Sequence, residues 1–166
     1  MTAYSSREEI PEQYHWDLTS IYESDDAFLT ALEEAKKLPG QCAAFQGKIS
    51  QSAADLLAFL KLDDEVSLAF TRLINYAERK SDEDTRSSRY QDFSSQVMAL
   101  YVQVAAAASW FSAELLTLDD KQMAAFYRKE PGLELYRRSL DVIFRRRAHV
   151  LSPAEEKLLA SAGDMA

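Results

Sequence analysis

The two histidines are the first residues to test for metal chemistry, because a catalytic zinc ion needs about three side-chain ligands and an open position. His15 lies in a polar N-terminal stretch, and His149 follows a run of arginines. Neither belongs to a helical H-E-x-x-H pattern, which would place two imidazoles and a general base on one helix face. The sequence therefore indicates no metal site in this chain, and we interpret each histidine as a surface or capping residue.

The other reactive side chains also lack catalytic partners in the sequence. Cys42 is the single cysteine, and nothing selects a histidine partner for it, so a small buried side chain is the preferred interpretation. The four glycines are far apart and form no phosphate-binding loop. Acidic clusters at 63–64, 82–84 and 119–120 fall at expected helix ends or connectors, where they complement the helix dipole. A small enzyme that uses carboxylates alone stays the third hypothesis.

Arginines near the C-terminus form the candidate binding site. Arg137 and Arg138 lie in an expected helix, and Arg145, Arg146 and Arg147 occupy its last turn. An arginine fork can bind a carboxylate through two parallel hydrogen bonds, so these residues are candidates for contact with a peptide terminus or with another domain. A second interpretation stays open, in which the last-turn cations compensate the negative end of the helix.

Composition limits the class of protein. The chain has 166 residues, of which 47% are hydrophobic and 28% charged, and these values fit one soluble globular domain. Glycine and proline number only four each, which favours long helices over a β fold rich in turns. The net charge of −8 argues against nucleic acid and against an anionic membrane surface as partners. No signal-peptide core or membrane-spanning apolar run is present, so we expect a cytoplasmic protein.

Apolar residues at helical spacing predict an all-α fold, a multi-helix bundle. Ser24 is expected to begin the first helix, because a serine hydroxyl can cap free backbone amides, and the Pro-Gly pair at 39–40 is expected to end it. Ser52 begins a second helical stretch that reaches Arg79, and the sequence leaves open whether it breaks near Asp63.

The most regular apolar pattern covers residues 84–116, after a charged connector at 81–85. Its apolar residues alternate in steps of four and three, which is typical of a helix packed along its length against other helices. This pattern predicts one long central helix. Within it, the small residues at 105–108 would allow a neighbouring helix to approach closely.

Two parts are expected along the chain. Residues 1–20 contain Pro11 and have mixed polarity, which predicts an extended N-terminal arm. Residues 21–166 form the helical domain, whose last expected helix begins at the capping sequence 152–155. Terminal segments stay ordered only where they are held down, and four apolar residues are expected to hold the arm against the bundle: Trp16, Leu18, Ile21 and Tyr22.

Several short strings resemble the N-terminal region of the oligoendopeptidase F family. They are R-E-E-I-P at 7–11, Y-H-W-D-L at 14–18, F-Q-G-K-I at 45–49, Y-A with D-E-D-T and Y-Q within 76–91, and R-R-A-H-V-L-S with E-E-K-L-L within 146–159. They occur in the family's order and cover nearly the whole chain, so their combination is more specific than any one string.

This resemblance implies a mostly helical zinc metallopeptidase that cleaves short peptides inside a deep cleft. The family's H-E-x-x-H motif and downstream acid have no matching positions here, so no catalytic residue carries over and the chain alone should be inactive. By resemblance, zinc belongs to the parent enzyme. The expected partners are the protein's own C-terminal catalytic domain, which is absent here, and short peptide substrates.

The same resemblance implies a role for the helical region as part of the wall and cover of the cleft. Such a cover limits substrates to unfolded peptides and shields the chemistry from bulk water. This hypothesis also predicts an apolar patch where the catalytic domain docks. The alternative is a free-standing helical protein-interaction module, whose partner would contact a helix face or groove.

Overall fold

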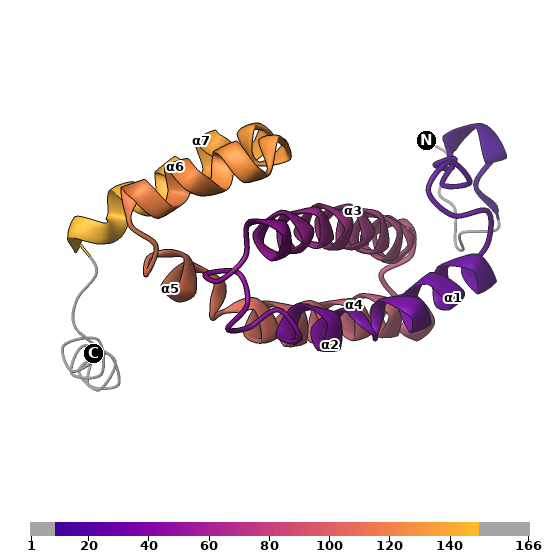
Figure 1. Ribbon diagram of the computed structural model, residues 1–166. Helices are drawn as coiled ribbons and strands as arrows, with labels where there is room; N and C mark the ends of the chain where they lie inside the picture. The colour runs from indigo at the N-terminus through magenta and orange to yellow at the C-terminus, as the bar shows by residue number, and fades with distance from the viewer. Residues whose placement is uncertain (1–8, 150–166) are drawn as a thin grey trace.

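The computed structural model describes residues 9–149 and contains helices but no strand within them, which confirms the all-α fold (Figure 1). The expected helix start at 152–155 lies outside the described residues. The α-helices are α1 (Asp25–Ala35), α2 (Leu38–Ala43), α3 (Ala53–Glu83), α4 (Ser88–Ala108), α5 (Phe111–Leu115), α6 (Asp120–Lys129) and α7 (Arg137–Arg145), and the short 3-10 helices are η2 (Glu12–Tyr14), η3 (Pro131–Tyr136) and η4 (Arg146–His149).

The helices α3 and α4 form the centre of the fold. A short turn joins them, and they pack along each other while α2 contacts α4 (Figure 1). Buried side chains recur at helical spacing on both helices, which is the pattern of two amphipathic faces meeting in a common core. On α4 these buried residues are Phe93, Val97, Leu100 and Val104, as the apolar pattern predicts.

The predicted long helix is present, but its bounds differ from those expected. The helix α4 has 21 residues and ends at Ala108, where the Ser109 backbone N–H and hydroxyl both donate to the Ala106 carbonyl. These bonds to the residue three positions earlier replace the regular helical hydrogen bonds, so α4 ends here and α5 follows as a separate short helix. The longest helix is α3, which has 31 residues and runs unbroken through Asp63 to Glu83. The connector before α4 is therefore shorter than expected.

Capping residues explain where three helices begin. The Ser24 hydroxyl accepts a hydrogen bond from the Ala27 N–H at 3.1 Å, and the Ser52 hydroxyl accepts one from the Asp55 N–H at 3.2 Å. Asp119 and Gln122 form a reciprocal capping box at the start of α6. All three starts agree with the sequence-based expectation.

The expectation for the Pro-Gly pair at 39–40 is wrong. The helix α1 ends earlier, at Ala35, and the pair lies inside α2. Proline is tolerated in the first turn of a helix because its missing N–H would have no intrahelical partner there. In this chain Pro39 therefore belongs to the start of a helix and not to the end of one.

The described part of the N-terminal arm lies against the C-terminal end of α3 (Figure 1). The Trp16 backbone N–H donates to Glu83 Oε1 at 3.1 Å, and the Arg79 guanidinium lies 5.6 Å from the centroid of the Trp16 ring. Leu18 is buried, and Arg72 donates to the Ile21 carbonyl. These contacts hold the arm by both apolar and polar interactions.

The helix α4 and its continuation include a long stretch, residues 94–113, without a charged side chain. No single helix among the described residues is long and apolar enough to cross a membrane. The segments Ser88–Leu115 and Asp120–Lys129 pass that test only as a pair, by length and composition, and they are bent by 111° at the break between them.

Candidate functional site

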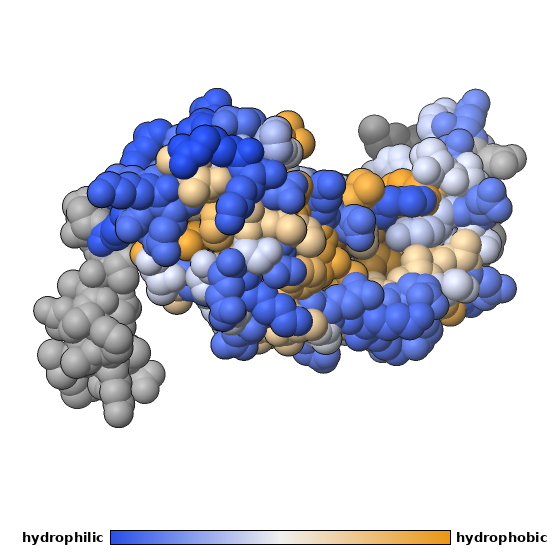
Figure 2. Space-filling view, viewed as in Figure 1, coloured by the Kyte–Doolittle hydropathy of each residue, from blue (hydrophilic) through white to orange (hydrophobic). Residues whose placement is uncertain are grey.

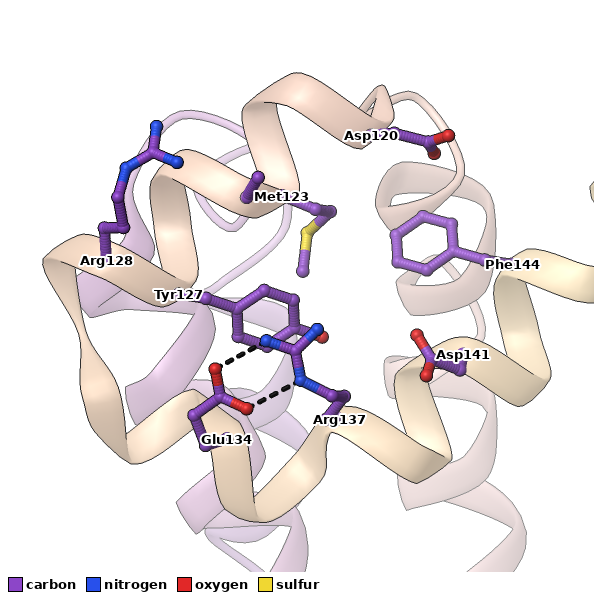
Figure 3. Close-up of a pocket in the computed structure, with 9 residues that line it drawn as sticks. Asp120, Met123, Tyr127, Arg128, Glu134, Arg137, Asp141 and Phe144 are labelled. Atoms are coloured by element: carbon purple, nitrogen blue, oxygen red, sulfur yellow. Dashed lines mark hydrogen bonds and ion pairs between the residues drawn. The ribbon is translucent and has the colours of Figure 1, made fainter.

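A hollow of about 500 Å³ lies between α6 and the η3–α7 segment, and it contains the predicted site residue Arg137 (Figure 3). Its lining mixes apolar, acidic and basic side chains, namely Asp120, Met123, Ala124, Tyr127, Arg128, Glu134, Arg137, Asp141 and Phe144. Of the five predicted arginines, Arg137 is the one that lines this hollow.

The inner faces of these helices explain where the hollow forms. Met123 on α6, Leu133 on η3 and Leu140 on α7 are buried in the common core, which turns the charged faces of α6 and α7 outward. A Cβ atom at Gly132 would lie only 3.0 Å from Leu57 Cδ2 of α3. Glycine at this position therefore lets η3 approach α3 closely.

Arg137 is already paired with a carboxylate of its own chain. Its Nε donates to Glu134 Oε2 at 2.6 Å, and its Nη2 donates to Glu134 Oε1 at 2.5 Å (Figure 3). These bonds raise the pKa of the Arg137 guanidinium and lower that of the Glu134 carboxyl. An incoming peptide carboxylate would have to displace Glu134 from this bidentate pair.

Tyr127 lies beneath the Arg137 guanidinium, which is 3.9 Å from the centroid of the tyrosine ring (Figure 3). Its hydroxyl is buried and has no hydrogen-bond partner among the described residues. Burial raises the pKa of this hydroxyl, and the positive charge of Arg137 lowers it to a smaller extent. The lining of the hollow therefore includes a tyrosine whose neutral hydroxyl is buried beneath it.

The other predicted arginines do not converge on this hollow. Arg147 donates from Nη2 to the Leu118 carbonyl at 2.6 Å, and its guanidinium lies 4.8 Å from the Phe144 ring centroid. The other three, Arg138, Arg145 and Arg146, are exposed and do not line the hollow. The described residues thus form no shared carboxylate pocket from the five arginines, and their contact with another domain or with a peptide stays a prediction.

The zinc ion that the family resemblance implies does not fit the described residues. Among residues 9–149, no three histidine, cysteine, aspartate or glutamate side chains are close enough together to hold a metal ion. His15 Nε2 lies 3.0 Å from the Ile10 carbonyl oxygen, and the side chain of His149 is outside the described part. Cys42 is buried, and burial raises the pKa of its thiol away from the reactive thiolate.

Sequence analysis missed the acidic and tyrosine side chains of the hollow. Glu134 and Arg137 are three residues apart, a spacing at which an acid and a base form an ion pair on a helical segment. This contact could therefore have been predicted from the sequence. Asp141 and Tyr127 come from different elements, and the sequence gives no sign that they share a cavity.

Comparison with known proteins identifies relatives over most of the chain. The family described as Oligopeptidase F matches residues 114–166. The chain is 31% identical over 160 residues to the group B oligopeptidase PepB of Streptococcus agalactiae. It is 33% identical over 159 residues to the oligopeptidase PepF of Bacillus subtilis. Each alignment covers 96% of this chain but only 27% and 24% of the respective relative, so the chain spans about a quarter of their length.

Two crystal structures have the same fold over the aligned part. The oligoendopeptidase-F of Enterococcus faecium is similar with a TM-score of 0.67 and 34% identity, covering 86% of this chain and 28% of that one. A Chlamydophila abortus protein gives a TM-score of 0.81 with 28% identity, covering 94% of this chain and 26% of that one. In both, the helical unit described above is one part of a much longer polypeptide.

Proposed function

This chain belongs to the oligoendopeptidase F family and corresponds to its N-terminal region, and from that premise we propose that it is the accessory domain of an enzyme that hydrolyses short peptides. In this proposal the domain helps to wall and cover the substrate cleft. The observation that supports this proposal most directly is that the alignments cover 96% of this chain but only about a quarter of the oligopeptidases.

The chain's own contribution to hydrolysis is steric and not chemical. Its residues supply no metal ligand set among 9–149, so we assign the zinc ion and the general base to the catalytic part of the parent polypeptide. Long packed helices such as α3 and α4 suit a rigid wall, because their positions are fixed along their whole length by a shared core. A wall and cover of this kind exclude folded proteins and bulk water from the reacting bond.

The experiment that tests this function is a single-chain chimera. In it, the chain replaces the matching quarter of the Bacillus subtilis PepF, and the isolated chain and a PepF variant lacking that quarter serve as controls. We expect the chimera to hydrolyse a short internally quenched peptide, to leave a folded protein intact, and to differ in both respects from the truncated enzyme. A truncated enzyme with unchanged activity and unchanged size selectivity would contradict the proposed role.

The free-standing interaction module is the second candidate, because α4 exposes apolar residues that another protein could bind. This alternative predicts that the chimera has no peptidase activity while the isolated chain forms a stable complex with a separate protein. An active chimera removes the reason to prefer it.

A further inference from the structure

The outer side of α4 has an unusual composition for a solvent-facing helix. Residues 94–113 contain no charged side chain, although 28% of the whole chain is charged. Met98, Tyr101 and Val102 nevertheless have 48%, 45% and 62% of their surface exposed. Ala105 is exposed beside them. We call these four residues the α4 outer face.

The α4 outer face flanks the buried face of the same helix. Its members occur at spacings of three, four and seven residues, which place them on one side of a helix. The adjoining side, which includes Val97 and Leu100, is buried, and α4 contacts α3 and α2. The apolar surface of α4 therefore extends beyond the part that this domain buries, and so wide an apolar surface is typical of a helix that is covered on more than one side.

A hollow of about 470 Å³ continues this face toward α3. Its floor includes Phe70, whose ring packs edge-on against Tyr101 with centroids 5.4 Å apart. Its α3 border carries the neutral side chains Ser67, Thr71 and Asn75, and one acidic residue, Asp63, also lines it. Thr71 and Asn75 each donate a hydrogen bond to a carbonyl of their own helix, at 2.7 Å, which reduces the polar character of this border. An apolar floor between two parallel borders suits an incoming helix or other apolar segment.

We propose that the α4 outer face and its hollow are the surface on which the catalytic part of the oligoendopeptidase F polypeptide docks. This inference rests on the proposed function. The relatives carry about three quarters of their length outside the aligned region, and the Chlamydophila abortus structure has this fold at a TM-score of 0.81 as 26% of a longer chain. A second copy of this chain fits less well, because two chains of net charge −8 repel each other.

Another exposed apolar residue provides a matched control. Leu68 is 64% exposed on a different side of α3, in a hollow of about 380 Å³ shared with α1. Three charged residues, Glu34, Glu65 and Arg72, line the same hollow together with apolar ones. Figure 2 shows hydrophilic surface bordering the apolar strip between α3 and the α1–α2 helices. Leu68 therefore differs from Val102 in having three charged residues around its hollow, while its exposure is similar.

Thiol labelling distinguishes a covered from an uncovered position. Val102→Cys and Leu68→Cys are prepared in the isolated chain and in the full-length PepF chimera, with a maleimide as probe and mass spectrometry to locate the label. Cys42 is buried and serves as the unreactive internal reference. We expect equal labelling rates in the isolated chain. In the chimera, labelling at Val102→Cys should slow by at least about tenfold while Leu68→Cys is unchanged, because an interface core excludes water.

Each outcome separates this inference from the proposed function, because peptidase activity is measured on the same samples. Unchanged labelling of Val102→Cys in an active chimera overturns the docking surface and leaves the proposed function standing. Protection of Val102→Cys in an inactive chimera supports the docking surface and contradicts the proposed function. Protection of Val102→Cys that rises with the concentration of the isolated chain identifies a second copy as the occupant and overturns the inference.

Discussion

Two aromatic clusters lie toward opposite ends of α3, and their packing is similar. Toward the C-terminal end, the Phe28 ring stacks on Tyr76 and Phe93, with centroids 5.2 Å and 4.7 Å away. Toward the N-terminal end, the Phe59 ring lies 4.9 Å from Trp110 and 4.8 Å from Phe111. Both clusters join α3 to elements that come from distant parts of the sequence.

The clusters differ in how their polar atoms are satisfied. In the first, the Tyr76 hydroxyl donates to Asp25 Oδ1 at 2.8 Å, and Arg89 pairs with Asp25 Oδ2 at 2.8 Å. In the second, Trp110 Nε1 is buried without a hydrogen-bond partner in the described part of the chain. The rings of the first cluster are therefore coupled to a charged network at the start of α1, whereas the buried indole N–H of the second has no such partner among the described residues.

A carboxylate on α5, close in sequence to the rings of the second cluster, binds the loop before α3. Glu114 on α5 accepts hydrogen bonds from the Gly47 N–H at 2.6 Å and from the Ser50 N–H and hydroxyl, both at 3.0 Å. Gly47 has φ of +81°, a conformation that other residues adopt only with strain. The C-terminal end of α3 is therefore fixed through contacts between side chains, and the N-terminal end mainly through the backbone of a loop.

The largest expected effect comes from removing the ring at the centre of either cluster. Phe28→Ala and Phe59→Ala should each lower the free energy of unfolding by about 3–5 kcal/mol, because each deletes a fully enclosed aromatic side chain and leaves a cavity. Urea denaturation followed by circular dichroism measures the loss. A loss below about 1 kcal/mol for one variant would show that its cluster rearranges to fill the space, and the two ends would no longer be equivalent in packing.

Glu114→Gln should have the next largest effect, and only at the second cluster. The amide keeps the size of the side chain but loses the negative charge that three donors share, so we expect a loss of about 1.5–3 kcal/mol. Glu33→Gln is the matched control, because Glu33 forms an exposed pair with Lys36 that should contribute at most about 0.5 kcal/mol. Equal losses from the two variants in urea denaturation would mean that Glu114 does not hold the loop.

The same comparison separates what the sequence predicts from what it does not. Ser24 and Ser52 are readable as helix starts because capping depends on residues only three positions apart. The Glu114–Gly47 contact joins residues 67 positions apart, and no local pattern reveals it. The end of α4 was mispredicted for a related reason, since its apolar pattern continues past Ser109 while the local hydrogen bonds end the helix.

The candidate site follows the same division. The sequence shows that Arg137 lies near a helix start and that Glu134, three residues earlier, is a possible partner. Its contact with the Tyr127 ring depends on how α6 and α7 pack, which no spacing within either helix determines. Residue type therefore predicts the kind of chemistry available, and tertiary packing decides whether a group is still free to perform it.

Tyr76→Phe should produce a smaller, pH-dependent effect that is confined to the first cluster. Burial, followed by the hydrogen bond to Asp25, raises the pKa of Tyr76 above its ordinary value. The folded state then holds this proton more tightly than the unfolded state does. The stabilisation is complete below the unfolded pKa of about 10 and is lost as pH rises above it.

We therefore expect Tyr76→Phe to lose about 0.5–1.5 kcal/mol near neutral pH, the usual contribution of one hydrogen bond. Between about pH 9 and about pH 11, its stability should fall less steeply than that of the unmodified chain. Tyr136, whose pKa is raised to about 12 mainly by its hydrogen bond to Asp64, keeps part of the slope in both proteins. Parallel slopes in urea denaturation across this range would refute the role of Tyr76.

The smallest effect on stability is expected at the candidate site, from Arg137→Ala. Its bidentate pair with Glu134 is half exposed and screened by solvent, and its ring contact is with one tyrosine, so the loss should be the smallest of this series. The informative measurement is the Michaelis constant of the PepF chimera. An unchanged constant is expected, because the guanidinium fork already binds Glu134 and cannot hold a peptide carboxylate as well. A rise of about tenfold or more with unchanged stability would instead mean that substrate displaces Glu134, and the hollow between α6 and α7 would become a peptide-binding site in the wall of the cleft.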